Sequence, residues 1–307
     1  MSRLILWRLV QLPIILAVVF ALTFTLVWLI PGNPLDREDA KKPPAAVQEA
    51  MMRQYNLHSP WAFAGSYLQD VFFRGDFGPS LLIPGKRVSD IVEQALPVSV
   101  MLGLAGLGVG LVLGSLAGVA GALKPGSAFD ASSLAVALVG VSLPSFVTGS
   151  ALLIVFAGVL RWFPLDGWGT PQQAVLPAIT LGLAPAAYIA RLLRLQLADL
   201  MSSDFIRTAR AKGLTHRQSL FRHALKLAYL PVLSFLGPAA AATMTGSFVV
   251  EVVFNIPGMG TYFVDAVIAK DQFLVLAVVL IYASMLVLFN LAVDVAYAWL
   301  DPRIEVK

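Results

Sequence analysis

Long apolar stretches alternate with shorter polar ones along the whole chain. Six of these stretches are long enough, at about 1.5 Å of helical rise per residue, to cross a hydrocarbon core of about 30 Å. They are residues 9–30, 96–123, 131–158, 177–198, 228–250 and 273–299. The pattern therefore predicts an all-α integral membrane protein with six transmembrane helices.

The charged residues between these stretches predict the orientation of the chain. Arg3 and Arg8 precede the first stretch, which places the N-terminus in the cytoplasm by the positive-inside rule. Six crossings then return the C-terminus to the cytoplasm, together with segment 191–226, where eight Lys or Arg accompany two Asp. Segment 31–95, with seven basic and eight acidic residues, falls on the other side, as does 251–272, with one basic and three acidic residues.

We divide the chain at residue 95. Residues 1–95 are expected to hold the first helix and an extracytoplasmic cap segment, and residues 96–307 a five-helix core with a cytoplasmic loop at 199–227. Within the cap segment, 45–55 has helical periodicity. The residues after it form an apolar helical face: Trp61, Phe63, Tyr67, Leu68, Val71 and Phe72. A cleaved signal peptide is disfavoured for the first stretch, because its apolar run of about 22 residues exceeds a normal h-region.

Composition excludes several classes of protein. Hydrophobic residues make up 58% of the chain and charged residues 13%, which leaves too little polar surface for a water-soluble fold. The net charge of +4 is concentrated in the 191–226 segment, so we expect no nucleic-acid partner. The absence of cysteine excludes disulfides, thiolate metal sites and cysteine nucleophiles.

Glycine and proline mark how the helices pack and bend. Four glycines recur every fourth residue in the second stretch: Gly106, Gly110, Gly114 and Gly118. This stripe favours close packing of a neighbouring helix within the same subunit, although a pore or a subunit interface remains an alternative. Pro144, Pro177 and Pro185 lie inside the third and fourth stretches and predict kinks there.

The basic segment has the local signals of two short helices. Ser203 is expected to cap a helix that begins near Asp204, and Gly213 to end it in the left-handed conformation. Thr215 and Gln218 form a capping box that opens a second helix. Its expected apolar stripe is Leu220, Phe221, Ala224, Leu225 and Ala228, with Arg217, Arg222 and Lys226 opposite.

Two interpretations of this segment stay open on the residues alone. A basic loop of this kind could rest on anionic lipid, which requires only charge. The glycine elbow, the capping box and the small residues Thr208, Ala209 and Ala211 favour instead a shaped surface that another protein approaches closely.

The run from Arg207 to Gly213, followed by Leu230 and Pro231, resembles the EAA loop of ABC importer permeases, in the form found in the dipeptide/oligopeptide (peptide/nickel) family. Arg207, Thr208 and Ala209 stand where the general motif has Glu-Ala-Ala, and the peptide subgroup shares the departure from Glu. Four further segments resemble motifs of that family in the same order: 31–34 (PGNP), 75–80 (GDFGPS), 251–260 (EVVFNIPGMG) and 301–303 (DPR).

The resemblance implies a B-type permease with the type I ABC importer fold in a bacterial-type cytoplasmic (inner) membrane, crossing it several times and contacting membrane lipid. Its expected partners are a homologous permease, two ATPase subunits and an extracytoplasmic solute-binding protein. The expected cargo is di- or oligopeptides. ATP and Mg would bind to the partner ATPases, because this chain has no Gly-x-x-x-x-Gly-Lys-Ser/Thr motif and is expected to bind no cofactor or metal and to have no catalytic residue.

The resemblance also assigns two groups of site residues. The expected ATPase-coupling residues are Asp204, Arg207, Thr208, Ala209, Arg210, Lys212, Gly213 and Leu214. The expected residues of the extracytoplasmic rim or gate are Glu251, Asn255, Pro257, Gly258 and Gly260. For Glu251, the alternative is a charge exposed to water at the rim.

Two other functions were weighed against this one. An ion-coupled secondary transporter of small solutes would also use kinked helices, but no chain of Asp, Glu and His lies at mid-membrane and Asp294 is close to a helix end. An intramembrane enzyme is disfavoured because His58, His216 and His223 all fall outside the predicted spans.

Overall fold

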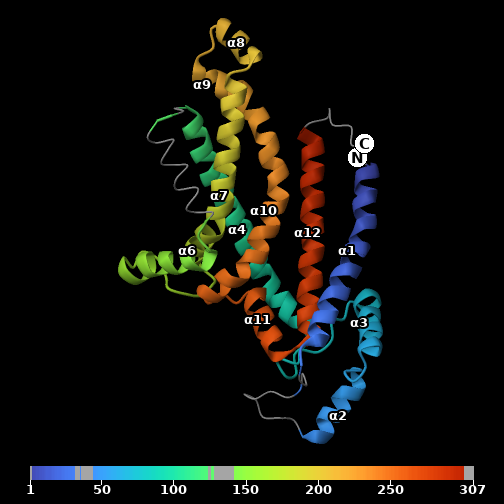
Figure 1. The fold of residues 1–307 in the computed structure, drawn as a ribbon. Coiled ribbons are helices and arrows are strands. Elements are labelled where there is room, and N and C mark those ends of the chain that lie inside the picture. The colour runs from blue at the N-terminus through green and yellow to red at the C-terminus, as the bar shows by residue number, and fades with distance from the viewer. Residues whose placement is uncertain (1, 32–34, 36–43, 124–125, 128–141, 301–307) are drawn as a thin grey trace. The chain divides into compact units, whose positions relative to one another are not determined.

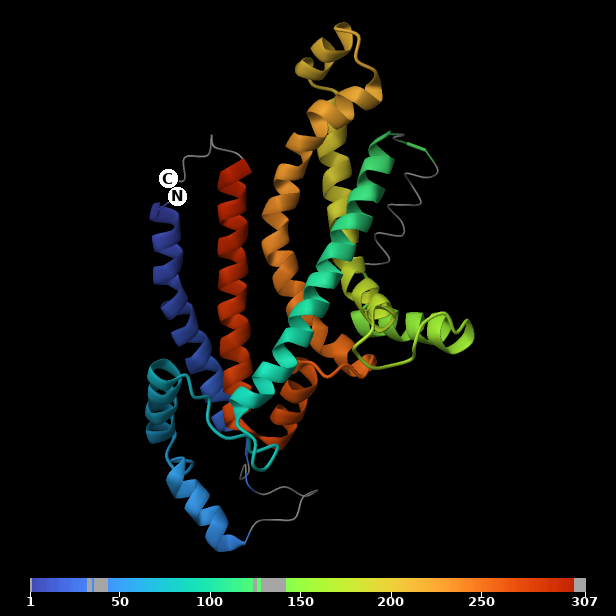
Figure 2. The ribbon, with the colours of Figure 1, turned by 180° about the vertical axis from the view of Figure 1, so that it is seen from behind.

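The computed structural model describes residues 2–31, 35, 44–123, 126, 127 and 142–300 (Figures 1 and 2). Regular structure in these residues is helical, apart from one isolated antiparallel bridge between Pro79 and Arg87. The α-helices are α1 (Ser2–Leu29), α2 (Ala45–Gln54), α3 (Pro60–Arg74), α4 (Val88–Leu123), α6 (Ser145–Leu152), α7 (Pro171–Met201), α8 (Asp204–Ala211), α9 (His216–Ser219), α10 (Leu225–Val253), α11 (Met259–Ala269) and α12 (Gln272–Leu300). Two π-helical segments, η1 (Leu153–Val159) and η2 (Leu220–Ala224), complete the set. The prediction of an all-α protein is confirmed.

Within the described residues, five helical stretches are long and apolar enough to cross a membrane. They are Val10–Leu29, Val88–Leu123, Pro171–Met201, His216–Met244 and Gln272–Val295, and each overlaps one predicted span. The predicted span 131–158 is described only from residue 142 onward, where α6 and η1 form a shorter apolar helix, Ser145–Val159. The predicted sixth crossing therefore stays a prediction, as do the motifs at 31–34 and 301–303, which lie largely or wholly outside the described residues.

The chain divides into two compact units. One consists of residues 1–4, 100–256 and 288–307, and the other of residues 5–99 and 257–287. Each unit contains buried side chains.

In the first unit, α4 and α7 pack closely along the glycine stripe. A methyl group built on Gly114 would lie 2.6 Å from the carbonyl oxygen of Ala186, and one on Gly118 would lie 2.8 Å from that of Ala190. Gly182 of α7 makes the reciprocal approach to the backbone of α4, where its methyl group would lie 2.9 Å from the Gly110 nitrogen. The glycines thus serve close helix packing inside one chain, as the spacing predicted.

The same unit has an apolar core between α7 and α10. Its fully buried members come from both helices and from the loop that joins them: Ile189, Leu193, Leu197, Ile206, Leu220, Ala224, Ala228 and Val232. Tyr188 and Phe235 stack with ring centroids 4.1 Å apart, and the Tyr229 hydroxyl donates to Ser115 of α4. The last part of α12 joins α10 where Asn290 lies against Gly237. These contacts hold the loop at 202–215 on a rigid helical base.

The prolines are only partly where the sequence placed them. Pro177 and Pro185 lie inside α7, as predicted. Pro144 instead stands at the N-cap position immediately before α6, in an extended conformation with φ −57° and ψ 143°. The proline that was expected to kink a helix therefore stands at the start of one.

The second unit is built around a cluster of aromatic rings. Phe63 and Tyr67 of α3 contact three rings of α1 and the ring of Phe273, at the start of α12; the α1 rings are Phe20, Phe24 and Trp28. The first turn of α11 is fixed separately, because the Met259 N–H donates to the buried Ser99 hydroxyl of α4 at 2.8 Å.

The helices predicted in the cap segment are present as α2 and α3. The predicted apolar face of α3 is wrong in part, since Phe63 and Tyr67 are buried while Trp61 and Phe72 are exposed. At 100° per residue, Trp61 and Phe72 lie on a different side of the helix from the buried pair. The apolar residues of α3 thus form two faces rather than one.

Candidate functional site: the basic loop and the 251–260 turn

Helix α8 is held in place by one buried side chain. Figures 1 and 2 show α8 and α9 beyond the shared end of α7 and α10. Ile206 is fully buried in the core formed with Leu197 of α7 and Leu220 of η2. Sequence reasoning missed this anchor, although an isoleucine within a strongly basic segment was the available signal. Burial of Ile206 turns the other sides of α8 outward.

The start of α8 differs from the prediction. The helix begins at Asp204 with Ser203 at the N-cap position, but the Ser203 side chain makes no capping hydrogen bond. Its hydroxyl donates instead to the carbonyl of Leu200, at the end of α7. The expected cap at Ser203 is therefore wrong, because the hydroxyl closes the turn between the two helices.

The end of α8 is a Schellman motif at Gly213. Gly213 has φ +92°, its N–H donates to the Arg210 carbonyl at 2.9 Å, and the Leu214 N–H donates to the Ala209 carbonyl at 3.3 Å. A left-handed residue is required here for the two bonds to form, and glycine adopts that conformation without strain. The predicted glycine elbow is confirmed.

After the elbow, the capping box is also confirmed. The Thr215 N–H donates to the Gln218 side chain at 2.9 Å, and the Gln218 N–H donates to the Thr215 hydroxyl at 3.3 Å. The helix that begins there is not a separate short one, since α9 continues through η2 into α10. Of the predicted apolar stripe, Leu220, Ala224 and Ala228 are fully buried, whereas Phe221 is exposed. The π-helical turn shifts the register at that point, so Phe221 leaves the buried side.

The exposed side of the loop is basic and hollowed. Arg207, Arg210, Gly213, Leu214 and Thr215 line an open hollow of about 520 Å³. Of the remaining predicted coupling residues, all of which belong to the same loop, Asp204, Thr208 and Lys212 are exposed, and Ala209 is half-buried. Arg207 pairs with Asp204 at 3.2 Å, an exposed contact that contributes little to stability. The structure thus brings the predicted coupling residues together on one small surface.

The first part of the 251–260 segment is a second Schellman motif, at the end of α10. Asn255 has φ +51°, its N–H donates to the Val252 carbonyl at 3.3 Å, and the Ile256 N–H donates to the Glu251 carbonyl at 2.8 Å. The Phe254 carbonyl accepts the Gly167 N–H at 3.3 Å. The turn is therefore ordered by backbone bonds, with the exposed Asn255 at its tip.

Glu251 itself is fully buried. The alternative of a charge exposed to water at the rim is therefore wrong for this residue. The rest of the segment belongs to the second unit, where Pro257 is exposed and Gly258 and Gly260 are buried at the start of α11.

A further ordered site was missed by sequence reasoning. The buried carboxylate of Asp271 accepts the Ser80 hydroxyl and the Leu82 N–H at 2.8 Å each, and its other oxygen accepts the Leu274 N–H at 3.1 Å, capping α12. Burial raises the pKa of Asp271 even though these hydrogen bonds oppose the shift. A methyl group on Gly78 would lie 2.4 Å from the Phe273 ring, so segment 75–80 needs its glycine. The motif at 75–80 was the signal for this site in the sequence. Its partner, Asp271, is 191 residues away from Ser80 and could not be predicted from the motif.

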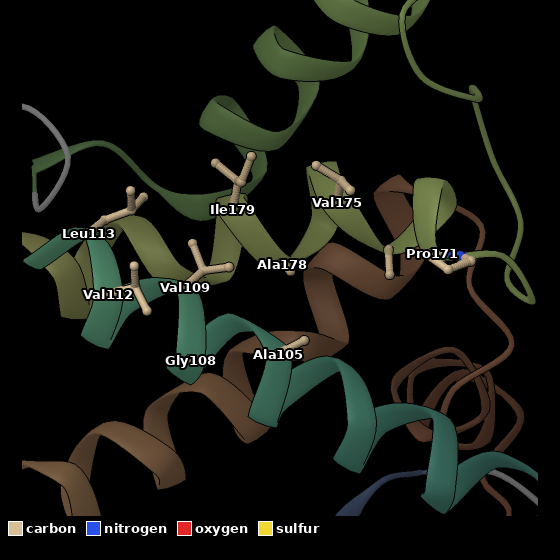
Figure 3. Close-up of a pocket in the computed structure, with 10 residues that line it drawn as sticks. Ala105, Gly108, Val109, Val112, Leu113, Pro171, Val175, Ala178 and Ile179 are labelled. Carbon is tan, nitrogen blue, oxygen red and sulfur yellow. The ribbon is translucent and has the colours of Figure 1, made fainter.

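An apolar groove of about 570 Å³ lies between α4 and α7 (Figure 3). Its lining is formed only by apolar residues, among them Val109, Val112, Val175 and Ile179. Among the described residues, no three His, Asp or Glu side chains are grouped so that they could hold a metal ion. The groove therefore offers apolar contact but no acid–base or metal chemistry.

Comparison with known proteins gives concordant results. Residues 110–306 match the family described as binding-protein-dependent transport system inner membrane component. The chain is 36% identical over 305 residues to the dipeptide transport system permease protein of Bacillus subtilis, covering 99% of this chain and 98% of that protein. It is 39% identical over 308 residues to the oligopeptide transport system permease protein of Escherichia coli, covering 99% of this chain and all of that protein.

A solved structure shares the fold. The crystal structure of an amino acid ABC transporter with histidines contains a chain that matches with a TM-score of 0.52 and 16% sequence identity. The match covers 69% of this chain and 94% of the other. At this identity the likeness concerns the arrangement of helices alone.

Proposed function

Because this chain belongs to the family of binding-protein-dependent transport system inner membrane components, and is thus an ABC transporter permease rather than an enzyme, we propose that it forms the membrane path for di- or oligopeptides in an ATP-driven importer. The peptide cargo is supported by the names of its full-length relatives. The chain would act in the inner membrane beside a homologous permease.

The observation that carries the proposal is the construction of the basic loop. Ile206 anchors α8 in the core, and the Gly213 elbow and the Thr215 capping box fix the connection from α8 to α9. The Ser203 hydroxyl, which donates to the Leu200 carbonyl, closes the connection from α7. A loop that only rested on lipid headgroups would need none of these contacts. A rigid, basic hollow supports instead the docking of a partner protein, and in this family the partner is an ATPase.

In the proposed mechanism, the loop converts the partner's movement into access to the path. ATP and Mg bind to two ATPase subunits, and their closure displaces α8. Since Ile206 is packed among residues of α7 and η2, and η2 continues into α10, a displacement of α8 is transmitted to both long helices. The inward-open and outward-open states would then be populated according to the nucleotide state.

The opposite end of the path is proposed to meet the extracytoplasmic binding protein. Asn255 at the tip of its Schellman motif and Pro257 are the exposed residues of the 251–260 segment. Buried Glu251 supports this turn from within its own unit. We therefore assign contact with the binding protein to Asn255 and Pro257, and a supporting role to Glu251, Gly258 and Gly260.

The docking proposal is tested with a matched pair at Gly213. A Cβ at residue 213 would meet no atom within 4 Å, but its φ of +92° strains any side chain there. Asp and Asn have the same shape and enter the left-handed region more readily than other side chains, so the added negative charge is what distinguishes Gly213→Asp from Gly213→Asn. We expect the Asp variant to lose copurification with the ATPase subunits and the Asn variant to keep it. Ala209→Glu, with Ala209→Ser as its control, tests the neighbouring half-buried position in the same way.

Normal peptide uptake by both Gly213→Asp and Ala209→Glu would refute docking at this surface. Uptake that survives ATP depletion while a proton gradient persists would instead support the ion-coupled alternative. The cargo is tested separately, by purifying the complex with its binding protein and identifying the bound solute by mass spectrometry. A bound solute that is not a peptide would refute the peptide assignment without affecting the docking result.

A further inference from the structure

Helix α3 has an exposed aromatic face that the proposed function does not use. Trp61, Phe72 and Phe73 are 83%, 62% and 86% exposed. Trp61 and Phe72 are eleven residues apart, so they lie about 20° apart around the helix, with Phe73 about 100° farther on. Three large rings therefore share one side of a 15-residue helix.

The whole of this face is uncharged. The other exposed positions between the rings are Ala62, Gly65 and Gln69. The two charged residues of α3 lie on the other side of the helix, where Arg74 pairs with Asp70 at 2.8 Å. An uncharged surface with three exposed rings is costly to leave in water.

Contacts with α1 show where along that helix α3 lies. Phe63 contacts Trp28 and Phe24, with ring centroids 5.6 and 6.3 Å apart, and Tyr67 stacks on Phe20 at 6.0 Å. Phe20 is nine residues before the end of the apolar stretch Val10–Leu29, a distance of about 13 Å along a helix, or nearly half of a hydrocarbon core. Helix α3 thus runs beside the second half of the membrane-spanning stretch and not beyond it.

We propose that α3 is embedded in the leaflet that surrounds the C-terminal half of α1, with its aromatic face against lipid. By the predicted orientation of the chain, this is the outer leaflet. The predicted extracytoplasmic cap then has two parts, α2 in water and α3 in the membrane. The assignment depends on the membrane location of the chain and not on what is transported.

Lipid fits this face better than another protein does. Helices that pack against each other in membranes favour small residues at their interface, whereas the exposed face of α3 presents three of the largest side chains. On α1, an apolar stripe that includes Val18, Leu22 and Leu26 is also exposed, at 54%, 62% and 65%, on the side of that helix away from the rings that contact α3. Trp61, the ring expected nearest the membrane surface, is of the residue type that is enriched at membrane–water interfaces.

Helix α3 also contacts the first turn of α12. The Phe63 and Tyr67 rings contact Phe273, in the first turn of α12, and the Tyr67 hydroxyl donates to the Phe273 carbonyl at 3.5 Å. One side of α3 therefore contacts lipid while the other supports α12. Lipid contact would fix the depth of α3 and with it the beginning of that helix.

The absence of cysteine from the chain allows a direct test. Single cysteines at Trp61, Phe72 and Phe73 would be spin-labelled in the complete transporter, reconstituted in phosphatidylethanolamine and phosphatidylglycerol vesicles. For each spin label, the accessibility to oxygen, which concentrates in lipid, is then compared with the accessibility to a water-soluble nickel chelate. Leu22→Cys on α1 is the lipid control, and Glu49→Cys, on the exposed side of α2, is the water control.

We expect the labels at Phe72 and Phe73 to match that at Leu22, with an oxygen-to-nickel accessibility ratio severalfold above that at Glu49. The label at Trp61 should report a shallower depth, because Phe63 lies nearer the end of α1 than Tyr67 does. Labels at Phe72 and Phe73 that are open to nickel would place the face in water. Immobile labels closed to both reagents would place it against a protein. Either result would overturn the proposal. Because all three side chains are exposed, the substitutions remove no buried packing contact.

Discussion

Ile206 shows how one apolar residue can define a polar surface. Eight of the other residues in segment 204–213 are polar, charged or small, yet the orientation of all of them depends on the single side chain that is buried. The sequence marked the glycine elbow and the capping box because both have local signatures. Ile206 was distinguished only as an isoleucine in a basic segment, because the residues of α7 and η2 that bury it come together only in the fold.

Replacing Ile206 with alanine should release α8. Truncation of a fully buried isoleucine costs about 2–5 kcal/mol, and here the loss falls on a short loop with few other apolar contacts. We expect trypsin to cleave the Ile206→Ala variant faster than the unsubstituted protein in inside-out vesicles, at Arg207, Arg210 and Lys212. Phe205→Ala is the control, because Phe205 is 43% exposed and its removal leaves no buried cavity. Equal cleavage rates in the two variants would show that Ile206 does not anchor the loop.

Asp271 is the second residue whose role depends on distant partners. Asp271→Ala would leave the buried Ser80 hydroxyl without its acceptor, at a cost of about 1–3 kcal/mol. It would also remove the shorter of two hydrogen bonds of the Leu82 N–H, which donates to the Ser80 hydroxyl oxygen as well, at 3.2 Å. The N-terminal cap of α12 would be lost as well. We expect a clearly lower melting temperature in detergent, followed by tryptophan fluorescence. Asp265→Ala removes an exposed carboxylate from the neighbouring helix and should leave the melting temperature unchanged.

At the scale of elements, packing along the glycine stripe can be tested with two glycines of the same helix. A methyl group on Gly114 would lie 2.6 Å from the Ala186 carbonyl oxygen and 2.8 Å from the Ile189 side chain, so Gly114→Ala should force α4 and α7 apart. Overpacking of this kind costs about 1–3 kcal/mol. Gly108→Ala meets no atom within 4 Å and should be neutral or slightly stabilising, because alanine favours helix. Thermal unfolding of the two variants checks the expectation, and similar melting temperatures would contradict it.

The elements that the sequence predicted correctly are those with local causes. Five apolar stretches, the helices α2 and α3, the elbow at Gly213 and the capping box at Thr215 all follow from periodicity or from residues within one turn of each other. The errors have non-local causes. The Ser203 hydroxyl bonds to the end of α7, Phe221 is turned outward by a π-helical segment, and Trp61 and Phe72 lie on a second face of α3.

For the whole molecule, the number of crossings decides the side on which the basic loop lies. With six crossings, Arg3, Arg8 and the loop share the cytoplasmic side, as the positive-inside rule requires. With five, the loop that we assign to the ATPase would face away from ATP. The outcome turns on the third predicted span, 131–158, which is described only from residue 142 onward.

Cysteines on either side of that span test the number of crossings. Ser127→Cys should react with a membrane-impermeant maleimide only in inside-out vesicles, and Asp166→Cys only in right-side-out vesicles. Arg210→Cys in the basic loop should behave like Ser127→Cys, and Arg53→Cys on α2 like Asp166→Cys, because six crossings place each pair on a common side. If Ser127 and Asp166 reacted from the same side, residues 131–158 would enter and leave the membrane without crossing it. The positive-inside rule would then be broken at the basic loop, and the assignment of that loop to a cytoplasmic ATPase would have to be abandoned.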